Sequence, residues 1–458
     1  MNPFQFDMAL QRPVFYMMRR GIKIDQPLRA KLLHEYQDEY NKWQANLNLL
    51  AGQYINTSSP PQMKRLLYEE LGLPLRHKNK KVTTDEDAIR ASMAWAEDKI
   101  RHVKTEDARM KWQRAYLSTK VILKIRGIRK ILESYLDINI DEDGRVRCTI
   151  SVGGTETMRF SHSKTLWGTG LNLATIPHKL RTMFIPDEGY ELAEFDLNRG
   201  ESWVYSYKSM DPELIRIHSG GLDFHAETAA AIQTAFGASG RTLTADDIRR
   251  LAKEGDQFGF KIRYLGKKVN HASAYRMGPF RAAEVINEEA DDTGITVVPG
   301  QMKKAQKLWL DKYPGIRRWW DDIDKKLEST RKLTTPYGRT RDFFGFMSDH
   351  LKKEATAYEP QSTSVDYLNH GMLRVYEELV AKGAYSLELL HQNHDSILVQ
   401  YPVENRDEVV GEVKARLRSV VRISGCDVSI PVDAGVGQNW GDYHKEKNPN
   451  GLRELKAA

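Results

Sequence analysis

The chain has 458 residues, of which 40% are hydrophobic and 29% are charged, so it has the composition of an ordinary soluble protein with two or three domains. No run approaches the ~20 apolar residues that a membrane span needs, and residues 1–9 lack the pattern of a secretion signal. Two cysteines far apart, Cys148 and Cys426, indicate a reducing compartment and argue against a disulfide framework or a cysteine-ligated zinc site. The net charge of +7 permits a polyanionic partner but does not identify one.

Helical patterns predominate in the first part of the chain. Leu28, Leu32, Leu33 and Tyr36 recur at three-to-four spacing and predict a helix over about 27–52. A second helix is expected over 62–70, and a long helical stretch over 85–135. Between them, residues 76–81 form a strongly basic loop, which taken alone is typical of a solvated run of charge.

Strand patterns appear only after this helical part. They begin near Val146 and recur at 191–196, whereas 201 to about 332 reads as mostly helical. A turn at 334–341 joins short strands, a helix follows over about 351–382, and 387–401 predicts strand, tight turn, strand. The last ordered block is 431–440. The pattern predicts an α+β fold in which helical lobes flank a small, mostly antiparallel sheet.

Two aspartates, Asp196 and Asp395, each stand at the end of an apolar strand-like run. Two carboxylates within ~4 Å repel by roughly 4 kcal/mol at an effective dielectric of ~20, so such a pair favours divalent cations. Two cations ~3.5–4 Å apart can hold the attacking and leaving oxygens of a phosphoryl transfer. The ordinary alternatives are a cap or turn role for Asp196 and a hydrogen-bonded turn network around Asp395.

A basic and aromatic stripe lies between the two acids. Its members recur every four residues, so they wind slowly around one helix: Arg263, Lys267, His271 and Tyr275. The cationic end suits phosphates, and the aromatic end suits a sugar and a base. A charged surface helix is the ordinary alternative. The order carboxylate, cationic helix, carboxylate favours a template-directed nucleotide polymerase.

These features together resemble the polymerase portion of family A DNA polymerases, including bacteriophage enzymes, over nearly the whole chain. Residues 195–202 resemble motif A, 263–278 motif B and 392–396 motif C. Further blocks that agree in order are 155–161, 171–177, 223–229, 360–366 and 437–440. Each block alone is weak, but their shared order is specific.

The resemblance implies a right-hand fold. Its expected divisions are a palm of residues 1–45, 140–205 and 336–458, a thumb of 46–139 and fingers of 206–335. No 3′–5′ exonuclease domain is expected, because the resemblance already begins near Phe4. The implied reaction is DNA-directed nucleotidyl transfer in DNA replication, located in the cytoplasm, which would be that of a bacterial host if the chain is phage-encoded.

The resemblance also implies roles around the reacting atoms. Asp196 and Asp395 would bind two Mg²⁺ ions, with Mn²⁺ able to substitute, and the backbone carbonyl of Leu197 would be a further ligand. The residues implied to surround the nucleotide are Arg263, Lys267, His271, Tyr275, Glu201 and His225. Among these, Lys267 is also a candidate proton donor to pyrophosphate, and Glu201 would disfavour ribonucleotides. From its position alone, Glu201 could instead be a first-turn acid that complements a helix dipole.

The implied partners are primer–template DNA and deoxynucleoside triphosphates, with a separate exonuclease or processivity factor possible and no membrane. Residues that match primer or template contacts are Arg159, Arg181, Asn172, Gln361, Gln392 and His394. By the same resemblance, phosphate contact becomes the better interpretation of the basic loop at 76–81.

Several positions depart from the family pattern. His271 stands where Phe or Tyr is customary, which leaves dideoxynucleotide discrimination open. Ser396 stands where a glutamate usually follows the motif C aspartate, and Arg276 replaces a glycine. None of these changes removes an implied metal ligand.

Two rival functions remain at this stage. Single-subunit RNA polymerases share the Arg-x3-Lys-x7-Tyr stripe and a His-Asp-Ser motif C, but Glu201 favours DNA synthesis because those enzymes leave room for the 2′-hydroxyl. A non-catalytic nucleic-acid-binding scaffold is the second rival. Intact Asp196, Asp395, Arg263 and Lys267 favour an enzyme.

Overall fold

The computed structural model describes residues 1–237 and 242–455, which form two compact units. The first unit comprises 1–21, 150–162 and the described residues from 186 onward, and the second comprises 22–149 and 163–185. Helices with small antiparallel sheets confirm the predicted α+β class. The division into palm, thumb and fingers stays a prediction. Residues 22–45, 140–149 and 163–185, predicted as palm, fold within the second unit. Among the described helices, none has the length and apolar character needed to cross a bilayer.

A five-stranded antiparallel sheet lies at the centre of the first unit, in the order β11-β12-β8-β15-β16. Its strands are β8 (Tyr190–Leu197), β11 (Glu388–Asn393), β12 (Ser396–Pro402), β15 (Val432–Gly437) and β16 (Arg453–Glu454). The strand predicted at 191–196 and the hairpin predicted at 387–401 are confirmed. Along β8, Ala193, Phe195 and Leu197 are buried on one face. Glu194 and Asp196 therefore project from the opposite face.

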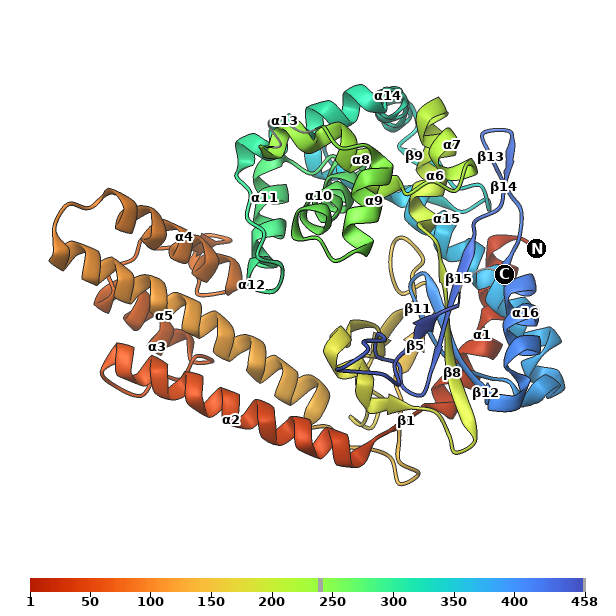
Figure 1. Cartoon of the computed structure of the whole chain (residues 1–458), viewed down its shortest axis with the longest axis horizontal. Helices are drawn as coiled ribbons and strands as arrows, with labels where there is room; N and C mark the ends of the chain where they lie inside the picture. The colour runs from red at the N-terminus through yellow and green to blue at the C-terminus, as the bar shows by residue number, and fades with distance from the viewer. Residues whose placement is uncertain (238–241, 456–458) are drawn as a thin grey trace. The chain divides into compact units, whose positions relative to one another are not determined.

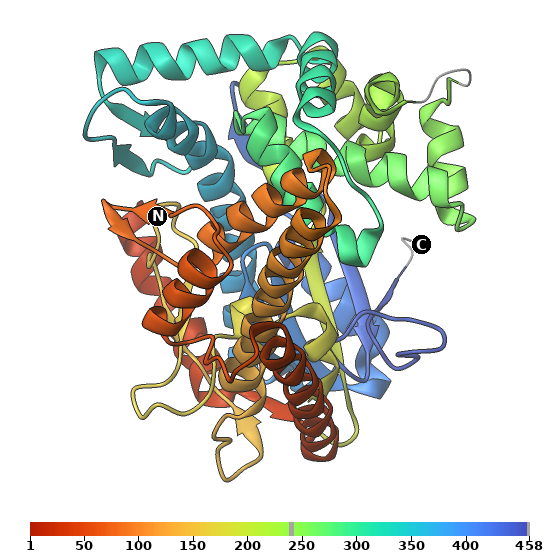
Figure 2. The same cartoon turned by 90° about the vertical axis from the view of Figure 1, so that its left-hand side faces the viewer.

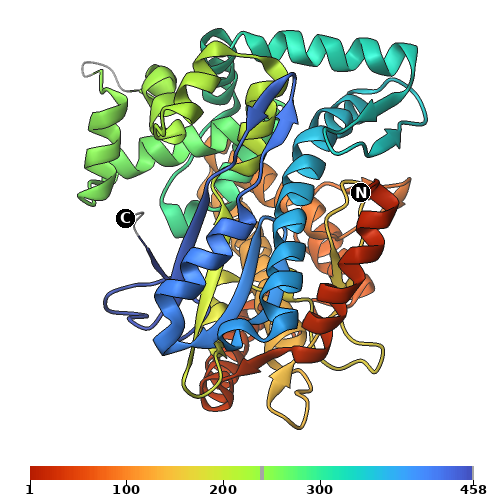
Figure 3. The same cartoon turned by 90° about the vertical axis from the view of Figure 1, so that its right-hand side faces the viewer.

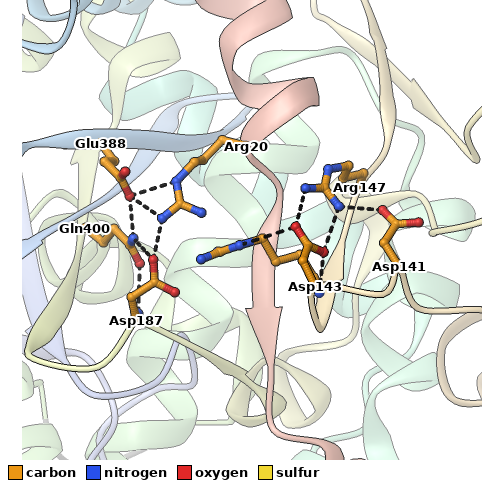
Figure 4. A network of polar contacts seen from close by, with 8 residues as sticks. Arg20, Asp141, Asp143, Arg147, Asp187, Glu388 and Gln400 are labelled. Atoms are coloured by element: carbon orange, nitrogen blue, oxygen red, sulfur yellow. Dashed lines mark hydrogen bonds and ion pairs between the residues drawn. The ribbon is translucent and has the colours of Figure 1, made fainter.

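Three helices cover one face of this sheet: α1 (Pro3–Arg20), α15 (Asp349–Glu378) and α16 (Arg406–Leu417) (Figure 3). Arg20 fastens the end of α1 to the sheet (Figure 4). Its Nε donates to Glu388 Oε2 at 2.8 Å, and its guanidinium also binds Asp187. Gln400 Nε2 donates to Asp187 Oδ2 at 2.8 Å. One polar network therefore joins α1, β11, β12 and the segment before β8.

The stretch predicted as mostly helical after residue 201 is confirmed (Figure 1). It contains α6 (Gly200–Ser209), α7 (Pro212–Ser219), α8 (Phe224–Ile232), α9 (Ala245–Lys253), α10 (Gln257–Ala274), α11 (Pro279–Glu288), α12 (Ala290–Thr293), α13 (Pro299–Lys312) and α14 (Gly315–Ser329). Trp309, Tyr313 and Phe224 are fully buried in its core. A methyl group added at Gly266 of α10 would lie 2.3 Å from the carbonyl oxygen of His225, so α10 packs backbone to backbone on α8. Beyond α14, β9 (Lys332–Thr334) pairs with β10 (Thr340–Asp342).

The second unit consists mainly of long helices, of which α4 and α5 pack against each other (Figure 2). Its elements are β1 (Ile22–Ile24), α2 (Gln26–Ala51), α3 (Pro60–Lys64), η1 (Arg65–Glu70), β2 (His77–Lys78), β3 (Lys81–Val82), α4 (Glu86–His102), α5 (Glu106–Ile131), η2 (Leu132–Leu136), β4 (Arg145–Val146) and β7 (Phe184–Ile185). The helical stretch expected over 85–135 is broken before residue 106, where the Thr105 side chain caps α5. The basic loop forms the β2–β3 hairpin, in which Lys78 binds Asp85 at 2.9 Å.

The second unit also contains a separate basic and acidic cluster, in which Arg147 binds Asp141 and Asp143, each at 2.6 Å (Figure 4). The remaining elements of the chain are β5 (Thr149–Ser151), β6 (Ser161–Ser163), η3 (Leu173–Thr175), η4 (His178–Met183), η5 (Gln233–Phe236), η6 (Val380–Lys382), η7 (Ala384–Ser386), η8 (Val403–Asn405), β13 (Val421–Ile423) and β14 (Cys426–Val428).

Candidate functional site

Asp196 lies on β8, and Asp395 lies in the turn that leads into its neighbouring strand, β12. Ser396, which follows Asp395, is paired with Asp196 in the β12–β8 register. The backbone N–H of Leu197 donates to the carbonyl oxygen of Asp395 at 2.9 Å. Sheet pairing therefore brings together two carboxylates that are far apart in the sequence.

Asp395 stands in the turn between β11 and β12. The preceding residue, His394, adopts a left-handed conformation with φ of 56°. Protein that surrounds the Asp395 carboxyl and displaces water raises its pKa, and the negative charges of Glu201 and Glu194 add to this effect. The electrostatic environment of Asp395 therefore favours a bound positive charge.

Other polar groups hold the strands around Asp196 in register. On its far side, Asp196 is paired with Asp433 of β15, which accepts from Asn198 Nδ2 at 2.7 Å. Glu194 accepts from Ser396 Oγ at 2.9 Å and from Trp440 Nε1 at 3.2 Å. Ser396, the departure from the motif C pattern, thus links β12 to β8.

Beside Asp395 is a cavity of about 300 Å³ within the first unit. It is lined by Arg199, Gly200, Glu201, Ser202, Tyr205, Phe224, His225, Lys267, Asn270, His271, Ala274, Tyr275 and Asp395. Six of the predicted site residues therefore meet around one space: Asp395, Glu201, His225, Lys267, His271 and Tyr275.

Glu201 is fixed from two sides of this cavity. Arg159 donates to Glu201 Oε1, and the Tyr275 hydroxyl donates to Glu201 Oε2. Burial raises the pKa of Tyr275 well above its ordinary value, and the Glu201 carboxylate raises it further. The hydroxyl consequently stays protonated and keeps donating.

The basic stripe does not face the cavity along its whole length. Lys267 and His271 line the cavity, whereas Arg263 is turned to Asp223, with its Nε 2.8 Å from Asp223 Oδ2. Surrounding protein lowers the pKa of His271, and Lys267 lowers it further, so its imidazole is neutral. Lys267 is therefore the member of the stripe that brings positive charge to the cavity, which Arg199 also lines.

Asn270, which the sequence analysis missed, fixes His225. Its Oδ1 accepts from Trp309 Nε1 and from Thr228 Oγ1, both at 2.7 Å. Because an indole N–H only donates, the amide Nδ2 must face His225 Nδ1, 3.2 Å away. Burial lowers the pKa of His225 to about 3, with Arg263 adding to the shift, so His225 is neutral and carries its proton on Nε2. The available sequence signal was an amide, with Ser273, among the mostly apolar residues of one face of α10.

The predicted primer and template residues are distributed over both units. In the first unit, Gln392 is fully buried and its Nε2 donates to Asn369 Oδ1 at 3.3 Å, while Gln361 lies half-buried on α15. In the second unit, Arg181 is buried in η4, and Asn172 Oδ1 accepts from Ala174 N at 3.1 Å to cap η3. The nucleic-acid roles of these residues, of Arg159 and of His394 stay predictions.

The carboxylates at the end of β8 and in the β11–β12 turn fit magnesium. Mg²⁺ prefers oxygen ligands and is commonly held by one or two carboxylates together with substrate phosphates and waters. Asp196 and Asp395 supply two such carboxylates. Over the described residues, no group of three or more His, Cys, Asp or Glu side chains forms a ready-made metal cage. Metal binding by these two carboxylates and by the Leu197 carbonyl stays a prediction.

Comparison with known proteins gives one consistent family. The chain is 24% identical over 457 residues to the thermostable DNA polymerase I of Thermus filiformis, covering 95% of this chain and 48% of that protein. It is 26% identical over 439 residues to DNA polymerase I of Helicobacter pylori, covering 92% and 42%. The chain thus spans about half the length of the curated relatives it matches.

A solved structure has the same fold. It is described as the POL domain of Pol1 from M. smegmatis in complex with DNA primer-template and dNTP, and it matches with a TM-score of 0.72 at 20% identity, covering 95% of this chain and 70% of that one. The sequence profile described as DNA polymerase family A matches residues 27–442. This chain therefore belongs to DNA polymerase family A.

Proposed function

We propose that this chain is a template-directed DNA polymerase that adds deoxynucleotides to a primer 3′-hydroxyl and releases pyrophosphate. The observation that carries the proposal is the pairing of β8 with β12. It sets Asp196 beside the Asp395 turn, and Asp395 shares a cavity with Lys267. Acidic and cationic groups on opposing elements are what an in-line phosphoryl transfer requires.

Asp196 and Asp395 would hold two Mg²⁺ ions, with Mn²⁺ able to substitute. When bound, such ions lower the pKa of an attacking hydroxyl and offset charge on a leaving phosphate. Lys267 and Arg263 bind the triphosphate oxygens, for which Arg263 leaves Asp223. Lys267 can then give a proton to the pyrophosphate oxygen as it departs. Neutral His225 donates from Nε2 to a phosphate oxygen, in the orientation that Asn270 imposes.

Sugar selection would depend on Glu201. Arg159 and Tyr275 hold both carboxylate oxygens, so Glu201 cannot swing away to admit a 2′-hydroxyl. His271 lies in the same cavity as Glu201, next to the space proposed for the sugar and base. Exclusion of the 2′-hydroxyl favours a DNA polymerase over a single-subunit RNA polymerase.

Primer extension with deoxynucleotides and ribonucleotides in parallel tests this function. Purified chain, a labelled primer–template and Mg²⁺ should give template-directed extension with deoxynucleotides and much slower extension with ribonucleotides. Preferential use of ribonucleotides without a primer would instead support the RNA polymerase alternative. Tight DNA binding without extension would support a non-catalytic scaffold.

Primer–template DNA and deoxynucleoside triphosphates are the proposed partners, and the bacterial relatives support a cytoplasmic location. If the protein neutralises about five DNA phosphates, a fourfold rise in salt concentration should lower its affinity for DNA by a factor on the order of 10²–10³. Fluorescence anisotropy at several salt concentrations measures this slope. A flat slope would contradict binding through a basic surface.

A further inference from the structure

Arg276 follows α10 in a conformation that suits glycine better than arginine. Its φ is 57°, in the left-handed region, where a residue with a side chain costs roughly 1–2 kcal/mol. Glycine, which the family pattern has at this position, would remove that cost. A compensating interaction of the arginine side chain is therefore to be expected.

The guanidinium supplies this compensation by binding α14. Nη2 donates to the carbonyl oxygen of Trp320 at 2.8 Å, and Nη1 lies 3.0 Å from Asp324 Oδ1. The guanidinium also lies over the Trp320 ring, 5.1 Å from its centroid. Only 15% of the Arg276 side chain and 21% of the Asp324 side chain are exposed. Partial burial makes such charge-assisted contacts stronger than those on an open surface.

Further bonds fasten the same short segment, residues 274–277. Trp320 Nε1 donates to the carbonyl oxygen of Ala274 at 3.3 Å, and Gln306 Nε2 donates to that of Met277 at 2.7 Å. Lys352 of α15 binds Asp324 at 2.9 Å and holds the partner of Arg276 in place. The backbone at the end of α10 is therefore tied to α13 and α14.

Tyr275, immediately before Arg276, points the opposite way and lines the nucleotide cavity. Its hydroxyl donates to Glu201, the group proposed to exclude the 2′-hydroxyl. Because the two residues are adjacent, the ties of Arg276 also fix the backbone from which Tyr275 projects. A shift of about an ångström in that backbone is enough to misplace the hydroxyl.

We propose that Arg276 is a positioning residue for sugar discrimination. Anchored on Asp324 and Trp320, it holds the Tyr275 hydroxyl on Glu201 and so keeps Glu201 closed against ribonucleotides, although Arg276 itself lines no part of the cavity. The inference rests on the proposed function and adds to it a determinant of specificity outside the cavity.

Arg276→Gly is the most informative variant, because it removes the anchor and the backbone strain together. The melting temperature should change little, whereas the ratio of kcat/KM for dATP to that for ATP opposite template thymine should fall about tenfold. Asp324→Asn should lower the ratio in the same direction, and Arg276→Lys should retain part of it. Arg281→Ala is the matched control, since Arg281 pairs with Glu284 and Glu288 on α11 and does not line the cavity.

A double-mutant cycle tests whether Arg276 acts through Tyr275. Tyr275→Phe removes the hydroxyl that binds Glu201, so Arg276→Gly should have little further effect on the ratio in that background. Additive losses would mean that Arg276 acts by another route and would overturn the inference. Unchanged selectivity in both Arg276→Gly and Asp324→Asn would overturn it as well.

Binding measurements separate this inference from the proposed function. The affinities of dATP and ATP for the complex with a dideoxy-terminated primer require no turnover, so they report discrimination even if extension fails. If the unmodified chain prefers dATP in binding but does not extend the primer, the proposed function is rejected. If Arg276→Gly then has a reduced dATP preference, the inference is still supported. Normal extension with an unchanged preference in Arg276→Gly would support the function and reject the inference.

Discussion

Strands β8, β11 and β12 carry the two acids beside the cavity, and we call them the carboxylate wall; Asp395 lines the cavity, whereas Asp196 does not. Backbone hydrogen bonds between these strands fix both acids. In the helical wall, formed by α8 and α10, contacts between side chains fix the functional groups. Asn270 orients His225, and Asp223 holds Arg263. The contacts of Arg276 with α14 hold Tyr275. A strand register depends little on the side chain at any one position, whereas a side-chain network depends on each of its members.

This difference shows which substitutions can separate chemistry from structure. A carboxylate in the first wall can be replaced by an isosteric amide while the strands stay paired. In the second wall, substitutions either change one charge facing the cavity or shift the helix that carries it. The following predictions test this contrast, starting with the largest expected effect.

Asp395→Asn should lower nucleotide incorporation on the order of 10³ or more, because it removes one of the two charges proposed to hold the metal ions. Primer–template binding and the melting temperature should stay close to those of the unmodified chain, because backbone pairing holds the turn. Single-turnover extension and anisotropy measure the two effects. Asp427→Asn, at the exposed position of β14, is the control and should retain activity.

Lys267→Ala should lower kcat/KM for deoxynucleotides on the order of 10², because it removes the lysine that faces the cavity. Lys268→Ala is the matched control, since Lys268 is turned to Glu289 and lies over the Tyr264 ring. Steady-state kinetics on one primer–template provide the comparison. Equal losses in the two variants would show that net charge, and not the position of Lys267, is what matters.

Gly266→Ala should disturb the packing of α8 on α10 without changing any polar or charged group that lines the cavity. The added methyl group would meet the His225 carbonyl at 2.3 Å and Ala229 Cβ at 3.0 Å, which forces α8 and α10 apart. Overpacking of this kind costs about 1–3 kcal/mol of stability, and we expect KM for deoxynucleotides to rise about tenfold as His225 and Lys267 separate. Gly300→Ala, where no atom lies within 4 Å, should leave both melting temperature and KM unchanged.

His218→Phe should make the helical part less sensitive to acid. Burial against Trp203 and Phe224 lowers the pKa of His218 to about 3, so its ring stays neutral in the folded chain at pH values where the unfolded chain is protonated. The contribution of the neutral His218 ring to the free energy of unfolding is therefore fully present above pH 6.5. It is lost as pH falls from 6.5 towards 3, by about 1.4 kcal/mol per pH unit.

Urea unfolding at pH 7, 6 and 5 measures this slope. The unmodified chain should lose more stability per pH unit than His218→Phe does. His350→Gln, at an exposed position, should behave like the unmodified chain. Parallel losses in all three proteins would show that His218 does not carry the acid sensitivity.

Much of the fold could be predicted from periodicity, because apolar residues repeat every two positions in strands and every three to four in helices. Those periods predicted the strand ending at Asp196, the hairpin around Asp395 and the stripe on α10. The pairing of Ser396 with Asp196 could not be predicted in this way, since strand register depends on packing between segments far apart in the sequence.

Side-chain partners were the least predictable part of the site. Arg263 was expected in the same stripe as Lys267, yet it is turned to Asp223, forty residues earlier in the chain. The three bonds of Asn270 likewise depend on α8 and α13, and the contacts of Arg276 depend on α14. A pattern of residue types along one helix does not show which neighbour each side chain meets.

The strand order has a consequence for biosynthesis. β8 is the middle strand of the five-stranded sheet, and both of its neighbours, β12 and β15, are encoded near the end of the chain. Until those segments leave the ribosome, both edges of β8 lack their native partners, and unpaired edges promote aggregation. A nascent chain that stops before residue 432 therefore has an incomplete sheet, and one that stops before residue 395 has only one of the two acids.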